Sequence, residues 1–122
     1  MNKEEIIKKL KILNLDKSKY LVISGASLVC HGIIDDTSDI DLSCRRDYYD
    51  EIDWKTKTGL FDTEIKYFDC FEIGPNFYTE ERDNIEGFPF MTLDDCLELK
   101  RRENKPKDKE LIKKLEDYLN NN

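Results

Sequence analysis

The first half of the chain switches between the apolar spacing of helices and that of strands. Ile6, Leu10 and Leu13 recur on one face of a helical pattern, which predicts an amphipathic helix over residues 3–15. The continuous apolar run over 20–24 is typical of a buried strand. The elements predicted next are a short helix over 26–31 followed by a glycine, a loop over 35–38, a strand over 40–44 and a helix over 47–52.

The second half predicts one long strand and two helices. Residues 61–73 alternate between two faces at the strand period of two, and a Gly-Pro-Asn turn follows at 74–76. Residues 76–90 are mixed and give no clear pattern. Thr92 suits the N-cap of a helix over 93–103, and Pro106 suits the first position of a last helix. This order predicts an α+β (α/β mixed) fold, a short mixed β-sheet with helices packed mainly on one face and an open opposite face.

Length and charge narrow the classes of protein to consider. A chain of 122 residues is expected to form one domain, with an N-terminal helix in 1–19, a core sheet in 20–91 and a helical pair in 92–122. The formal net charge of −7 argues against an extended nucleic-acid-binding face. Neither an 18-residue apolar run nor an apolar leader occurs, so we expect a cytoplasmic protein without a membrane span.

Cysteine and histidine usage argues against zinc. The cysteines form no Cys-x-x-Cys pair and only one histidine is present, so free buried thiols are expected. That histidine, His31, precedes Gly32 at the predicted end of a helix. We expect it to interact with the terminal helix carbonyls rather than to act in catalysis.

Two carboxylates, those of Asp39 and Asp41, stand two residues apart at the start of the predicted strand over 40–44. Asp39 and Asp41 therefore point to the same face, while Ile40 and Leu42 point to the other. Neighbouring acids repel unless a cation lies between them, and Mg²⁺ prefers such oxygen ligands together with substrate phosphates. An exposed edge strand blunted by acids is the alternative. The small turn over 24–27, Ser-Gly-Ala-Ser, lets a phosphate approach the backbone and favours the metal interpretation.

A third carboxylate is expected from the alternating segment over 61–73. Asp69 shares a predicted face with Ile65, Tyr67 and Phe71, and a carboxylate in such an apolar row needs compensation. A metal shared with the first two acids is one explanation, and an Asp that reaches solvent or an arginine is another. Glu72, on the other face, is the alternate candidate because a bulge would exchange the two faces.

Ile23-Ser24-Gly25, a spacer, and Asp39-Ile40-Asp41-Leu42 together resemble the nucleotidyltransferase superfamily related to DNA polymerase beta. The likeness extends over most of 20–119 and is nearest to small stand-alone bacterial members, including toxin-type nucleotidyltransferases. Ser24 stands where the family usually has glycine. The resemblance implies a nucleotidyltransferase-like fold in which a neighbouring strand supplies a third metal-binding carboxylate.

The basic segment over 100–109 matches part of the same family pattern. Lys100, Lys105, Lys107 and Asp108 follow the order of an inward lysine, a basic residue and a Lys-Asp pair that opens the next helix. The family commonly has a further Asp where this chain has Leu111. A solvated helix corner is the alternative interpretation.

The resemblance implies transfer of a nucleoside monophosphate from a nucleoside triphosphate by two-metal Mg²⁺ catalysis. Asp39, Asp41 and Asp69 would hold the metals and act in catalysis. The residues expected to bind the nucleotide are Ser24, Gly25, Ser27, Lys100 and Lys107. The sequence leaves open the acceptor (tRNA, protein or small molecule), the base preference and the oligomeric state. A catalytically silent relative that binds a nucleotide or a protein is the alternative function.

Overall fold

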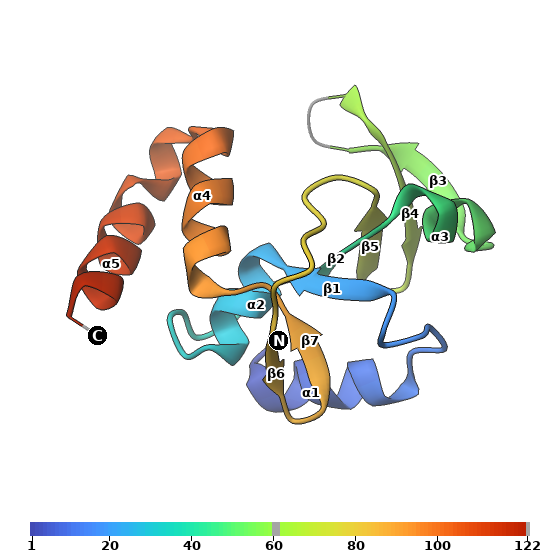
Figure 1. The fold of residues 1–122 in the computed structure, drawn as a ribbon, viewed down its shortest axis with the longest axis horizontal. Coiled ribbons are helices and arrows are strands. Elements are labelled where there is room, and N and C mark those ends of the chain that lie inside the picture. The colour runs from blue at the N-terminus through green and yellow to red at the C-terminus, as the bar shows by residue number, and fades with distance from the viewer. Residues whose placement is uncertain (60–61, 122) are drawn as a thin grey trace.

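A computed structural model describes residues 1–59 and 62–121 (Figure 1). Within these residues the fold is mixed α+β, with a seven-stranded open sheet of order β3-β4-β5-β2-β1-β7-β6. The pairs β1–β7 and β2–β5 are parallel and the other neighbours are antiparallel. The strands are β1 (Tyr20–Ile23), β2 (Ile40–Cys44), β3 (Lys55–Thr58), β4 (Glu64–Phe68), β5 (Phe71–Gly74), β6 (Asp83–Ile85) and β7 (Phe88–Phe90). The helices are α1 (Lys3–Ile12), α2 (Ser24–Cys30), α3 (Arg46–Glu51), α4 (Leu93–Glu103), the 3-10 turn η2 (Pro106–Asp108) and α5 (Lys109–Asn120).

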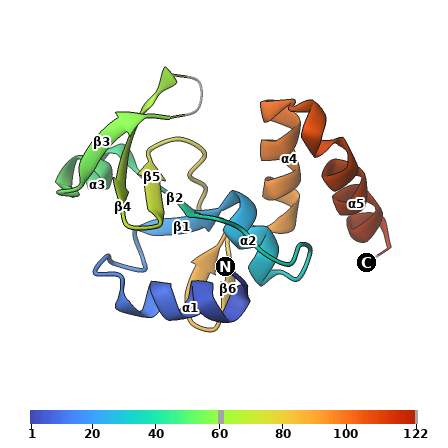
Figure 2. The ribbon, with the colours of Figure 1, turned by 180° about the vertical axis from the view of Figure 1, so that it is seen from behind.

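The interior strand β1, which lies next to the central strand β2, is buried on both faces. Tyr20 and Val22 join the apolar cluster that includes α1 and α2, whereas Leu21 and Ile23 join the cluster that includes α4 and α5. The helical pair α4–α5 stands beside the sheet in both views (Figures 1 and 2). The sequence predicts helices packed mainly on one face of the sheet. In the structure, helices cover both faces of β1. The difference arises because β1 carries apolar residues at every position, so both of its faces need cover.

Most predicted elements form with small changes in their ends. The α4 helix spans the predicted range, and the Thr92 hydroxyl accepts a hydrogen bond from the Asp95 amide, which confirms the N-cap. Pro106 begins the short turn η2 that leads into α5. Within the described residues, no helix combines the length and apolar character needed to cross a membrane.

The prediction of one long strand over 61–73 is wrong, because the described part of this segment forms two strands. Strands β4 and β5 pair antiparallel with Phe68 opposite Phe71, so Asp69 and Cys70 form the turn between them. Asp69 has a positive φ of 53°, a conformation that Asp tolerates better than most residues. The turn changes the face on which every later residue of the segment lies.

Two further pairings are not predicted from the sequence, although Phe88 and Phe90 of β7 are buried in the core. The edge strand β3 has the sequence Lys-Thr-Lys-Thr and is exposed throughout, and it forms only because β4 offers a free edge. The hairpin β6–β7 occupies part of the region over 76–90, and β7 pairs with β1. Both pairings widen the sheet beyond the core that hydrophobic spacing reveals.

Candidate active site

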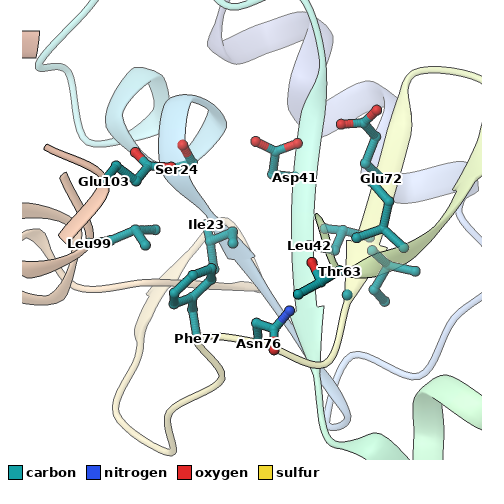
Figure 3. Close-up of a pocket in the computed structure, with 13 residues that line it drawn as sticks. Ile23, Ser24, Asp41, Leu42, Thr63, Glu72, Asn76, Phe77, Leu99 and Glu103 are labelled. Carbon is teal, nitrogen blue, oxygen red and sulfur yellow. The ribbon is translucent and has the colours of Figure 1, made fainter. Parts of the chain in front are cut away.

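A small cavity of about 130 Å³ opens on one face of the sheet, bounded by β2, β5 and α4 (Figure 3). The strand register brings three of its residues into one row, because Asp41 lies opposite Ile23 on one side and Glu72 on the other. The cavity is lined by Ile23, Ser24, Asp41, Leu42, Thr63, Ile65, Glu72, Ile73, Gly74, Asn76, Phe77, Leu99 and Glu103. Apolar and polar side chains therefore share the lining, and the carboxylates of Asp41, Glu72 and Glu103 lie toward one end in the view of Figure 3.

Asp39, Asp41 and Glu72 form what we call the acid cluster. Each offers one carboxylate oxygen, and the three oxygens lie within 4.8 Å of one another. Asp39 and Asp41 are thus held together, as the i, i+2 spacing predicts. Figure 3 shows Asp41 and Glu72 side by side, on the neighbouring strands β2 and β5.

The electrostatics of Asp41 follow from this crowding. Burial raises the pKa of its carboxyl to about 7, and the negative charges of Asp39, Glu72 and Glu103 add to the increase. Lys100 acts in the opposite direction and lowers the pKa of Asp41. The protein therefore holds a carboxylate where its negative charge is poorly compensated by the surrounding groups.

Asp69, expected as the third acid, lies in the β4–β5 turn and not in the acid cluster. Its carboxylate accepts a 2.9 Å hydrogen bond from the Lys9 ammonium, and its side chain is 52% exposed. The hydrogen bond from Lys9 lowers the pKa of Asp69. Glu72, the alternate candidate, takes the third position because the turn at Asp69 places it opposite Asp41. The sequence signal for this turn was Asp69 itself, which stands between two apolar residues and is a residue type common in turns.

The turn between β1 and α2 is shaped by two small residues. Ser24 has a positive φ of 56° and lines the cavity, so a serine adopts the conformation that glycine prefers. A Cβ on Gly25 would lie 2.8 Å from Oγ1 of Thr37, in the loop that leads to Asp39. Gly25 therefore lets the turn pack against the chain that carries the acids.

Ser27 does not contribute to the cavity, contrary to the prediction. Its side chain is fully buried, and its hydroxyl donates a 2.8 Å hydrogen bond to the Met91 carbonyl. Ser27 thus ties α2 to the start of the α4 segment. The helix-end role expected for His31 is confirmed, since Nδ1 lies 2.8 Å from the Ser27 carbonyl oxygen and Nε2 lies 2.9 Å from Asp83.

Lys100 points inward from α4, and two carboxylates hold its ammonium. Nζ lies 3.4 Å from Glu103 and 3.9 Å from Asp108, with only 13% of the lysine side chain exposed. Lys107 is exposed on η2 and is not among the residues that line the cavity. The basic segment therefore brings one lysine, and not two, close to the acid cluster.

Glu103 is a cavity residue that sequence reasoning missed. Its side chain is 8% exposed, and Oε1 accepts no hydrogen bond in the described structure. Glu103 follows Lys100 by three residues, so both lie on one face of α4, and this spacing was a usable signal. In the view of Figure 3, Glu103 and Ser24 both lie on the opposite side of Asp41 from Glu72.

Comparisons with known proteins do not assign the chain to a family. No family model, no curated protein and no solved structure matches it.

Proposed function

We propose that this chain has a nucleotidyltransferase-like fold and is a Mg²⁺-dependent nucleotidyltransferase that transfers a nucleoside monophosphate from a nucleoside triphosphate to an acceptor. One observation carries the proposal: Asp39, Asp41 and Glu72 lie close together, and Asp41 and Glu72 line a cavity with Ser24, the first residue of the Ser24–Gly25 turn. Both parts belong to the sequence pattern that resembles this superfamily. Their meeting in space gives that resemblance a physical basis.

The side chains at the cavity fit a divalent ion. Three carboxylates offer oxygen atoms within 4.8 Å of one another, and hard cations such as Mg²⁺ prefer this donor type. The raised pKa of Asp41 marks a carboxylate whose negative charge the surrounding groups compensate poorly, and a divalent ion at the acid cluster would relieve it. When bound, such an ion supplies charge neutralisation and makes the acceptor hydroxyl more acidic.

The chain's own groups have distinct roles in this reaction. The backbone of Ser24 and Gly25 binds the phosphate chain, and Lys100 offsets charge on the leaving pyrophosphate. The acceptor oxygen forms a bond to the α-phosphorus while the bond from that phosphorus to the bridging oxygen breaks. Glu72, at the open rim of the acid cluster, takes the proton that the acceptor hydroxyl loses.

A second candidate is a silent relative that binds nucleotide without transferring it. The favouring observation is that Glu103 and Asp108 already hold Lys100, which reduces the positive charge available to a triphosphate. Ser27, whose hydroxyl bonds Met91, offers no compensating phosphate contact. Both candidates predict metal-dependent nucleotide binding, so a binding assay alone does not separate them.

Two measurements test the proposal in sequence. Calorimetry with ATP, GTP, CTP and UTP should detect binding in Mg²⁺, which EDTA, Asp39→Asn or Asp41→Asn should abolish. Incubation with each α-³²P-labelled triphosphate and a cell extract should then move label to an acceptor in the wild type alone. Absence of nucleotide binding in Mg²⁺ refutes both candidates, and binding without transfer to any acceptor favours the silent module.

A further inference from the structure

Lys57 is a cation in direct contact with the acid cluster. It lies on the edge strand β3, and its Nζ forms an ion pair with Oε2 of Glu72. The strand register explains the contact. Lys55, Tyr67 and Glu72 lie opposite one another across β3, β4 and β5. Lys57 is two residues from Lys55 and therefore lies on the same face of the sheet. A long lysine side chain can cross this diagonal distance along one sheet face.

The contact concerns the acid cluster as a whole. The hydrogen bond with Glu72 raises the pKa of Lys57, and the negative charge of Asp39 raises it further. The Lys57 ammonium is therefore paired with Glu72 and is also attracted by the negative charge of Asp39. Lys57 thus supplies part of the positive charge that three adjacent carboxylates require.

We propose that Lys57 is the counter-ion of the acid cluster when no metal is bound, and that a divalent ion must displace Lys57 from Glu72 in order to bind. This inference rests on the proposed function, because it assumes that Asp39, Asp41 and Glu72 hold the metal. An ammonium and a divalent ion a few ångströms apart repel each other, so one carboxylate does not serve both equally well.

The surroundings of Lys57 allow this exchange without repacking of the core. Strand β3 is exposed along its length, and 44% of the Lys57 side chain is exposed. Glu72 is 27% exposed, so it can change partner at the rim of the cavity. Lysine is suited to this role because its flexible stem lets the ammonium move into water once it is released.

Calorimetric titration of the full chain with Mg²⁺ alone tests the inference. Lys57→Gln should bind Mg²⁺ about 5- to 10-fold more tightly than the wild type, because the competing charge is gone. Lys57→Arg keeps the charge and should stay within about 2-fold of the wild type. The matched control is Lys55→Gln, which makes the same change in net charge two residues away and should also stay within about 2-fold.

The outcomes separate this inference from the function on which it rests. If Lys57→Gln binds Mg²⁺ no more tightly than the wild type, or if Lys55→Gln tightens binding equally, the counter-ion role is refuted while the metal site stands. If neither the wild type nor Lys57→Gln binds Mg²⁺, the metal site itself is refuted. If the Gln variant fails to fold, wild-type NMR still decides. Mg²⁺ should then move the Lys57 side-chain ammonium signal to that of a free lysine, and an unmoved signal overturns the inference.

Discussion

Asp41 should destabilise the folded protein at neutral and alkaline pH when no metal is present. Its carboxyl has an ordinary pKa of 3.8 in the unfolded chain and a pKa of about 7 in the folded one. Each tenfold difference in proton affinity corresponds to ~1.4 kcal/mol, so the ionised group costs at most about 4 kcal/mol of folding free energy. Screening by salt and local relaxation reduce this, and we expect about 2–4 kcal/mol.

The sign of the pH dependence follows from the raised pKa. Protonated Asp41 contributes its full stability below pH 3.8, and this contribution is lost as the pH rises through about 7. Asp41→Asn removes the charge at nearly constant shape. The variant should therefore match the wild type near pH 4 and exceed it in unfolding free energy by about 2–4 kcal/mol at pH 8.

Urea denaturation at a series of pH values, with EDTA present, measures this difference. Asp36→Asn is the matched control, since it removes the same charge from an exposed loop position and should change stability little at any pH. Mg²⁺ should stabilise the wild type but not Asp41→Asn, because a ligand stabilises only the state that binds it. A stability difference that is absent at pH 8, or that does not vary between pH 4 and pH 8, refutes the electrostatic argument.

Three further variants test the turn and the buried charges around the cavity. Ser24→Gly should leave the protein as stable or up to about 1 kcal/mol more stable in urea denaturation, because glycine tolerates the positive φ; a clear loss of stability contradicts this. Gly25→Ala should cost about 1–3 kcal/mol through the close approach to Thr37, and adding Thr37→Ala should restore most of the loss; the absence of rescue contradicts the contact. Glu103→Gln should strengthen nucleotide binding in Mg²⁺ by about 3- to 10-fold in calorimetry, because Lys100 loses one competing carboxylate; unchanged affinity means that Lys100 does not meet the phosphates.

A short-range pattern was enough to predict that the two acids share a face, whereas the inward lysine was expected from the family resemblance. Asp39 and Asp41 share a face because strand side chains alternate strictly, and this geometry does not depend on the rest of the fold. Lys100 lies inward because helical spacing places it on the same face as Cys96, which is buried. Predictions of this kind need only the local element and its buried side.

The third acid depended on a turn that the alternating pattern hid. Phe68 and Phe71 flank Asp69 and Cys70, so the alternation of residues runs on through the turn. A hairpin and a single strand therefore look alike in the sequence. Only the pairing of β5 with β2 selects Glu72 as the neighbour of Asp41. Such a contact joins residues far apart in the chain, and hydrophobic spacing carries no information about it.

Buried and closely spaced carboxylates lie at the smaller cavity, and they are the strongest argument for a site there. Asp41 is ionised at a cost, Ser24 holds a left-handed conformation, and buried Oε1 of Glu103 lies 3.4 Å from the Lys100 ammonium without accepting a hydrogen bond. A second hollow, lined by Ile12, Leu13, Asn14, Leu15, Tyr48, Glu51, Ile52, Asp53, Trp54, Phe68, Asp69 and Phe71, is larger, at about 480 Å³. Neither Glu103 nor any member of the acid cluster belongs to that second lining. Local conflicts that persist in an otherwise consistent fold are expected where a ligand relieves them, so the smaller cavity and not the larger one is the candidate active site.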